Sequence, residues 1–369
     1  MNQFFRWDQM GLFLLTLAAG ILPFAVPEVC AAALREGLTL CSGPLLLSLF
    51  PFLVVSRLLI QCPESDLLAL PFRLAAWGIG IRTPCAARVL CIGFLGGFAP
   101  AASAAAQAVR TGQLTAEEAD ALLPACICSG PSFVVLTVGQ SLLGSAELGV
   151  LLFAAQITAN YLTAALLNRF AGVRSVKPES AAPASPAPPR LDEILADAAI
   201  TYCKLCGFIL FFRMLAAGAG ALLPAGAGAL CSILLEVCSG CDLASRTGRW
   251  GSLLCCAALS VQGLSVLLQV RTICPPEMTL RPLYRSRLLH LPLSLALFYL
   301  LLPGGDADVF STLPVRVLLM RRVPQDCALL VFAVCCMAAC TLRSGIRQVE
   351  QKQMARNAGG CCINSKTLL

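Results

Sequence analysis

The stretches PFLVVSRLL at 51–59 and GFILFFRML at 207–215 place one arginine at the same position in two long apolar segments. Each is followed by a second apolar segment that glycine interrupts, SGPSFVVLTVG at 129–139 and QGLSVLLQVRT at 262–272. Paired, interrupted hydrophobic segments in two halves of a chain are typical of a transporter-type binding site near the middle of the bilayer. The pattern therefore predicts two related halves, each with an interrupted membrane segment.

The composition indicates a membrane protein built from helices. Of the 369 residues, 58% are hydrophobic and only 13% are charged, and the mean hydropathy is +0.80. A water-soluble surface needs more charge than this. Because only helices and closed barrels satisfy the backbone in lipid, and because the apolar runs are long enough for helices of about 20 residues, we expect an all-α polytopic bundle. The lipid bilayer is then a partner. No run of five or more basic residues suggests nucleic acid.

The chain divides into six parts. They are an N-terminal membrane helix, 1–37; a first repeat, 38–170; a Pro/Ala-rich linker, 171–193; a second repeat, 194–303; a loop and last membrane helix, 304–342; and a basic tail, 343–369. Arginine and lysine flank the linker and fill the tail, so the positive-inside rule places both in the cytoplasm.

The direction of each segment follows from these cytoplasmic anchors. Segments 85–109 and 225–243 are expected to cross the membrane, whereas 121–144 and 250–271 are expected to dip in and return. Loop 110–120 is then placed outside. In this scheme the matched helices of the two halves run in opposite directions, which gives an inverted repeat with two re-entrant or broken helical hairpins.

Two shorter patterns refine this scheme. Thr115 is followed three residues later by Glu118, which predicts a capping box at the start of a short helix. The small-residue run GFLGGFAPAASAAAQAV at 93–109 is expected to let helix backbones pack closely. Four amides within apolar segments are expected to form hydrogen bonds across helices: Gln140, Gln156, Asn160 and Gln269.

The interruptions are the first candidates for chemistry. Pro131 removes a backbone donor and kinks its helix beside Gly130, which leaves carbonyl groups free. Gln262 and Gly263 interrupt the second segment in a similar way. Half-helix ends would then direct their dipoles at a bound solute. The alternative is two kinked helices that neighbouring helices support.

Three charged residues lie inside apolar segments. Glu236, in LCSILLEVCSG at 230–240, is a candidate solute ligand or proton acceptor, because a carboxylate in a membrane segment is costly and usually faces the bundle interior. Alternatively it lies near the inner interface or pairs with Arg213. Arg57 and Arg213 are interpreted as structural anchors, since long basic side chains extend toward the interface.

Nine residues form the candidate solute site: Ser129, Gly130, Pro131, Ser132, Glu236, Gln262, Gly263, Ser265 and Gln269. A coupling ion is a candidate partner, and the oligomeric state stays open. We expect no catalytic residue, cofactor or metal, because the chain has no Walker loop, GxSxG, HExxH or plausible triad. Its two CxxC pairs lie in or beside apolar segments of a chain with 21 cysteines, and nothing else completes a metal site.

The order of motifs resembles the YlbJ-type sporulation integral membrane proteins, which carry the nucleoside-recognition or gate domain twice. The motifs are PFLVVSRLL, a glycine-rich segment, CSGPSF, LEVCSG, LSVQGLSVLLQV and RPLYRSRLLH, over about 38–303. The resemblance implies a multi-pass protein of the bacterial plasma membrane in endospore formers, needed in spore development, with a transport role. The positions carried over are Ser129, Gly130, Pro131, Phe133, Glu236, Gly240, Ser260, Gly263, Leu264, Ser265 and Gln269.

The chain also departs from that family. Ile127 and Cys128 stand where the family usually has asparagines, and GGFAPAAS lacks the usual lysine. The sequence therefore leaves two functions open. One is a transporter or facilitator of a small polar solute, nucleoside-like or other. The other is a non-transporting membrane scaffold for spore envelope or cortex assembly. A hydrated cavity at the middle of the bundle would favour the first, and a dry, filled centre the second.

Overall fold

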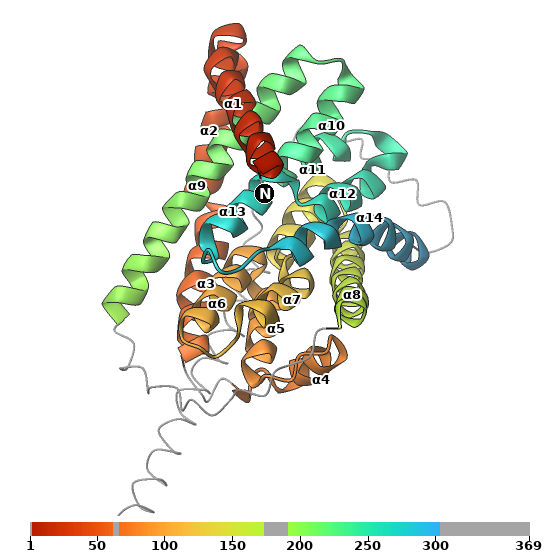
Figure 1. Ribbon diagram of the computed structural model, residues 1–369. Coiled ribbons are helices and arrows are strands. Elements are labelled where there is room, and N and C mark those ends of the chain that lie inside the picture. Colours follow the sequence, from red (N-terminus) through yellow and green to blue (C-terminus); the bar gives the residue numbers. More distant parts are fainter. Residues whose placement is uncertain (1, 62–65, 173–190, 303–369) are drawn as a thin grey trace, which may run out of the picture.

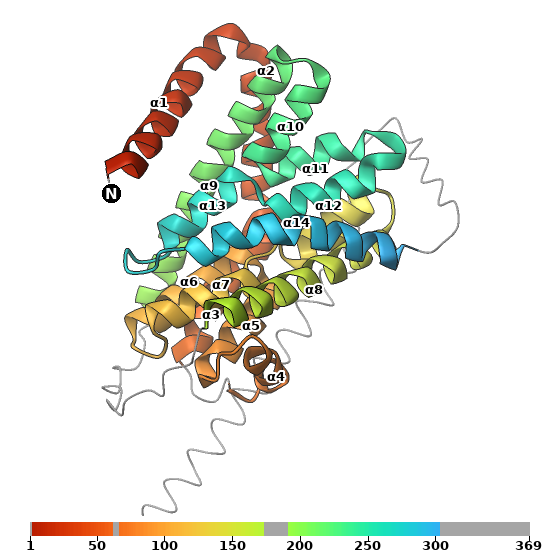
Figure 2. The same ribbon diagram turned by 45° about the vertical axis from the view of Figure 1, so that its right-hand side comes forward.

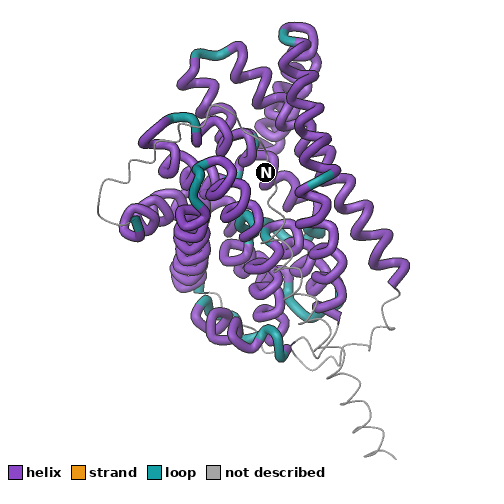
Figure 3. Tube along the Cα trace, turned by 180° about the vertical axis from the view of Figure 1, so that it is seen from behind, coloured by secondary structure: helices purple, strands orange, loops and turns teal. Residues whose placement is uncertain are grey.

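The structure, a computed structural model, describes three stretches of the chain: 2–61, 66–172 and 191–302. Within them every regular element is a helix, as Figures 1 and 3 show. The predicted all-α class is therefore confirmed for this part of the chain. The predicted parts 304–342 and 343–369 lie outside the described residues, and the linker 171–193 is described only at its two ends.

Within the described residues, three helical stretches are long and apolar enough to cross a membrane. They are Ala146–Ala171 (α8), Leu191–Leu222 (α9) and Gly248–Ile273. A further candidate is a pair of helices, Phe13–Ala25 and Pro27–Ser42, bent by 110° at the break between them. Since about 20 apolar residues suffice to cross a bilayer, these helices support the membrane protein that the composition indicated.

The first four helices of the chain are α1 Asn2–Ala25, α2 Pro27–Ser42, α3 Pro44–Gln61 and α4 Leu70–Gly78. Figure 2 shows the N-terminal end of α1 pointing away from the bundle. Its later turns contact α9 through Leu22, and α2 and α3 pack along α9. Gly37 permits the close approach of α2, because a Cβ there would lie 2.8 Å from Leu210 Cδ2 of α9. The N-terminal helices thus wrap one side of α9.

The first half contains a fold-back and an interrupted segment. Its helices are α5 Pro84–Gly96, α6 Phe98–Arg110, α7 Ala116–Cys126 and the π-helix η2 Ser132–Leu142. The chain reverses at Gly97 (φ 82°), so that a Cβ on Gly93 would lie 3.3 Å from Ala101 Cβ across the turn. In contrast, α7 and η2 continue past their interruption, and both pack against α8.

The second half also contains a fold-back and an interrupted segment. Its helices are α10 Ala225–Leu235, α11 Val237–Ser245, the short η3 Gly248–Trp250, α12 Gly251–Val261, α13 Gly263–Ile273 and α14 Arg281–Leu301. The chain reverses at Glu236, and a Cβ on Gly240 would lie 2.8 Å from Ile233 Cα across that turn. The residues of α12 and α13 together form one of the long apolar stretches, interrupted only at Gln262.

The fold-backs therefore lie in different segments from those expected. The sequence placed them at 121–144 and 250–271, but the chain reverses within 84–110 and 225–245 instead. The physical reason is local: Gly97 adopts a positive φ that a tight reversal requires. The Gly-Pro and Gln-Gly interruptions displace a helix without reversing it.

Hydrogen bonds place the loop after α6 on the same side as the end of α3. Arg88 donates to the Ile60 carbonyl (2.8 Å) and to Gln113 Oε1 (2.9 Å), and Gln113 Nε2 donates to the same carbonyl (3.2 Å). The predicted placement of loop 110–120 on the opposite side from Arg57 and Arg88 is therefore wrong. Because 84–110 turns back at Gly97, both of its ends lie on one side.

The two interrupted segments run in opposite directions. Asp120, near the start of α7, accepts from Thr279 N (2.8 Å), and Arg110 donates to the Ile273 carbonyl at the end of α13 (3.4 Å). One segment thus begins where the other ends. The predicted capping box is confirmed here, since Thr115 and Glu118 exchange their hydrogen bonds at the start of α7.

Candidate functional site

Each fold-back touches the interruption of its own half. A Cβ built on Gly97 would lie 2.6 Å from the Gly130 nitrogen, and one built on Gly263 would lie 3.0 Å from the Leu235 carbonyl oxygen. Gly263 has a φ of 69°, which favours glycine. These contacts explain why glycine stands at the points where two backbones meet.

Both halves line one cavity of about 70 Å³. Its polar side chains are Ser129 and Ser132 from the first half, where the Gly130 backbone also lines the wall, and Glu236 and Gln269 from the second. The rest of the wall is mostly apolar: Leu45, Leu49, Phe52, Leu95, Gly96, Phe98, Phe133, Ile209, Val237, Cys238 and Val266. The volume admits several water molecules, because one water needs roughly 10–15 Å³ of such space.

Glu236 holds the N-terminus of α11 at the tip of its fold-back. The carboxylate accepts from Cys238 N (2.8 Å), Ser239 N (2.7 Å) and Ser239 Oγ (2.8 Å), and the residue is 2% exposed. The helix dipole and these donors stabilise a negative charge at this position. Among the described residues, Oε1 accepts a hydrogen bond only from Cys238 N, so the carboxylate retains capacity to accept from a solute in the cavity.

Gln269 is held at one end only. Its Nε2 donates to Ser265 Oγ (2.9 Å), whereas its buried Oε1 finds no hydrogen-bond partner in the part of the chain that the structure describes. The residue is 2% exposed and lines the cavity. An unsatisfied buried acceptor costs free energy, so this oxygen is a ready partner for a donor that enters.

The other four predicted site residues are not part of the cavity wall. Gln262 adopts a left-handed conformation (φ 66°), and its Nε2 donates to the Leu259 carbonyl (2.7 Å), so it terminates α12. Ser265 positions Gln269 as described. The two that remain, Pro131 and Gly263, shape the backbone at the interruptions.

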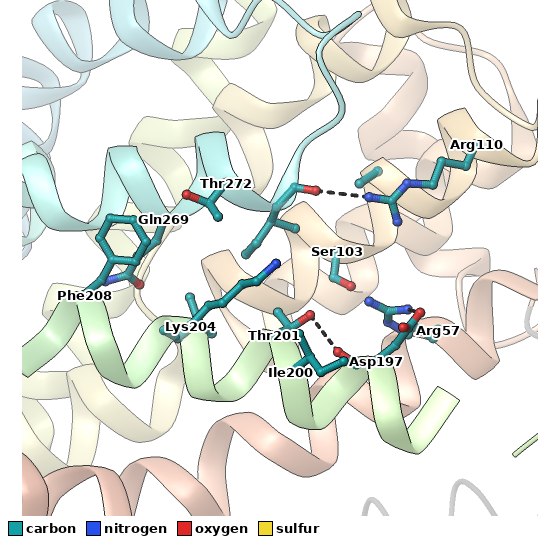
Figure 4. Close-up of a pocket in the computed structure, with 13 residues that line it drawn as sticks. Arg57, Ser103, Arg110, Asp197, Ile200, Thr201, Lys204, Phe208, Gln269 and Thr272 are labelled. Atoms are coloured by element: carbon teal, nitrogen blue, oxygen red, sulfur yellow. Dashed lines mark hydrogen bonds and ion pairs between the residues drawn. The ribbon is translucent and has the colours of Figure 1, made fainter. Parts of the chain in front are cut away.

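A second, larger hollow of about 180 Å³ leads to Gln269 from the side where α9 begins. Figure 4 shows Arg57, Arg110 and Lys204 directed toward this vestibule, which Ser103 and Thr201 also line. Gln269 lines both spaces and so stands between the vestibule and the cavity. Among the described residues its wall holds three basic side chains and one acidic side chain, Asp197, so the vestibule is positively charged.

The two repeated arginines are both anchored by carboxylates. Arg57 of α3 forms an ion pair with Asp197 of α9, and Arg213 of α9 pairs with Glu36 of α2 at 2.6 Å. Glu236 instead binds the start of α11, and within the described part of the chain it forms no close ion pair with Arg213, although the two charges still interact at longer range. The anchoring role of both arginines agrees with these contacts, although Arg57 also borders the vestibule.

A buried polar network lies between α8, α12 and α14. Asn160 and Gln156 of α8 form cross-helix hydrogen bonds as expected, to the Ile127 carbonyl (3.3 Å) and to Ser260 Oγ (3.0 Å). Arg287 of α14 joins this network, although the sequence interpretation did not single it out. Its position within an apolar helix, RPLYRSRLLHLPL, is the signal that could have identified it.

No protein-family model, curated protein or solved structure matches the chain. The functional assignment therefore depends on the geometry above.

Proposed function

We propose that this chain is an integral membrane protein that moves a small polar solute, nucleoside-like or other, through the cavity between its two halves. The observation that carries the proposal is the shared cavity, with Glu236 and the unpartnered oxygen of Gln269 in its wall. Pockets with a mainly apolar wall and a few convergent polar groups are typical of small-molecule sites.

The arrangement of the halves supports an inverted repeat. Each half has a fold-back whose tip touches an interrupted segment, and the two interrupted segments run in opposite directions. We propose that the fold-backs are re-entrant hairpins that enter from opposite faces of the membrane. Alternating exposure of a central site to the two faces is the usual mode of such proteins.

The position of the vestibule supports a path by which a solute reaches the cavity. It reaches Gln269 from the side of Arg57, Arg110 and Lys204, so a solute would pass cationic groups before it meets the cavity. Gln269 would then separate the two spaces. The resemblance of the motifs to sporulation proteins supports a place in the plasma membrane of an endospore-forming bacterium.

The test is uptake into proteoliposomes that contain the full chain. The vesicles are offered a defined mixture of nucleosides and other small polar metabolites, and their lumen is analysed by mass spectrometry. We expect at least one solute to accumulate with the wild type and its accumulation to fall with Glu236→Gln, because the neutral amide is a weaker acceptor at the tip of the α10–α11 fold-back.

Glu147→Gln provides the matched control. Glu147 is an exposed carboxylate in the first turn of α8, away from the cavity, so its variant should behave as the wild type. If no offered solute accumulates although the protein is folded, the transport proposal fails.

One observation favours the scaffold as the second candidate. Neither Ile127 nor Cys128 supplies an amide at the first interruption, so the described part of the first half contributes only the two serines as polar side chains to the cavity. Under this reading the interruptions serve close packing, and no variant of Glu236 would change the passage of any solute.

A further inference from the structure

Two side chains that do not line the cavity link the interruptions of the two halves. Asn160 Nδ2 of α8 donates to the Ile127 carbonyl (3.3 Å), and its Oδ1 accepts from Arg287 NH2 of α14 (3.1 Å). Arg287 NH1 reaches the Ser260 carbonyl (3.5 Å). This chain of contacts, here named the Asn160–Arg287 bridge, therefore runs from one interruption to the other.

Both ends of the bridge are C-terminal ends of half-helices. Ile127 follows the last residue of α7, and Ser260 lies in the last turn of α12. Carbonyl groups at helix C-termini lack intrahelical donors and carry a partial negative charge. The bridge thus directs a positive charge at one such end and, through Asn160, links it to the other.

Arg287 has no carboxylate partner among the described residues. Its side chain meets Asn160, the Ser260 carbonyl and its neighbour Ser286 (3.3 Å), and the residue is 8% exposed. A buried charge without an opposite charge is costly, and apolar replacements of buried ionic groups are often neutral or stabilising. Packing alone therefore does not account for an arginine here.

Carbonyls at the ends of half-helices are the groups with which ion-coupled transporters bind a metal cation. In this chain a guanidinium supplies a positive charge at such a junction. We propose that Arg287 is a positioning residue that acts as a built-in cation, a proposal that rests on the proposed function. It holds the α7–η2 and α12–α13 interruptions together, so that solute movement requires no sodium or potassium ion.

The first test compares uptake of the same metabolite mixture in sodium, potassium and choline chloride at equal ionic strength. We expect the wild type to give the same uptake in all three. Arg287→Met should lower uptake by about tenfold or more, as expected for a residue that couples two sites. Arg287→Lys, which keeps the charge but not the planar fork, should restore part of it without cation dependence. Saturable stimulation of the wild type by sodium or potassium, or full uptake by Arg287→Met, would overturn the proposal.

A second test does not depend on transport. Hydrogen exchange of the full chain in detergent should become faster in Arg287→Met at both interruptions, 126–134 and 258–266, because the bridge protects both. Arg285→Gln, an exposed arginine on the same helix, is the control and should change neither. Unchanged exchange at either interruption in Arg287→Met would refute the bridge. Faster exchange at both, in a protein without measurable uptake, would instead refute the proposed transport and retain the bridge.

Discussion

Gly97 and Gly130 are in backbone contact where the first fold-back meets the first interrupted segment. A Cβ on Gly97 would lie 2.6 Å from Gly130 N, and Gly97 has a φ of 82°. Gly97→Ala therefore introduces both backbone strain and a clash with backbone atoms that cannot move aside. We expect it to lower the free energy of unfolding by about 2 kcal/mol or more, measured as a fall of several degrees in the thermal midpoint.

Gly112→Ala separates the two causes. Gly112 has a similar φ of 69°, but a Cβ there would meet nothing within 4 Å. It should cost only the strain of a left-handed residue, roughly 1–2 kcal/mol. Equal losses for the two variants would show that the contact between Gly97 and Gly130 contributes nothing.

Glu236 should contribute to stability as well as to the site. Glu236→Ala removes three hydrogen bonds from the start of α11, and we expect a loss of about 1–2 kcal/mol, as for other helix N-caps. Ser145→Ala is the control, because Ser145 caps α8 through Leu148 N (3.2 Å) away from the cavity. Both variants should lower the thermal midpoint, but only Glu236→Ala should alter uptake. A Glu236→Ala protein as stable as the wild type would contradict its capping role.

The sequence predicted the class of fold and part of the site, for identifiable reasons. Hydropathy depends on composition, so the helices and their membrane character follow directly from the residues. Glu236 was identified because a carboxylate within an apolar segment is costly, and Ser129 and Ser132 because they flank the Gly-Pro interruption. Which interruption reverses the chain was not predictable, since it depends on which backbones touch, and Gly97 lies within a run of small residues that all favour close packing.

The vestibule and the bridge show a second limit. Arg110, Lys204 and Arg287 lie far apart in sequence, and each taken alone resembles an ordinary basic residue near a membrane segment. Their roles depend on the tertiary arrangement, in which α6, α9 and α14 bring them against the two interrupted segments. The predicted topology exchanged the crossing segment and the reversing segment in each half, so it could not place these residues together.

Gln269 should show opposite effects on stability and uptake. Gln269→Leu removes a buried oxygen that has no partner among the described residues. We therefore expect the free energy of unfolding to stay the same or rise by up to about 1 kcal/mol, measured as an unchanged or higher thermal midpoint. Uptake should fall, because the leucine cannot accept a hydrogen bond between vestibule and cavity. Gln140→Leu, at an exposed position of η2, should leave uptake unchanged. Normal uptake in Gln269→Leu would remove this residue from the solute path.

The placement of loops on the two membrane faces gives a test of the whole arrangement. Three exposed glycines outside the helices, Gly112, Gly144 and Gly172, accept an inserted epitope without a clash, since a Cβ at each would meet nothing within 4 Å. Gly144 and Gly172 lie at opposite ends of α8, and Asn168 near its end donates to the Ala121 carbonyl of α7 (3.1 Å). Tags after Gly112 and Gly172 should therefore react with antibody on one face, and the tag after Gly144 on the other, in right-side-out and inverted vesicles. If the tags after Gly112 and Gly144 react with antibody on the same face, the topology predicted from the distribution of basic residues is correct for this region. That result would also exclude a crossing of the membrane by α7 and η2, because the two ends of a crossing segment must lie on opposite sides.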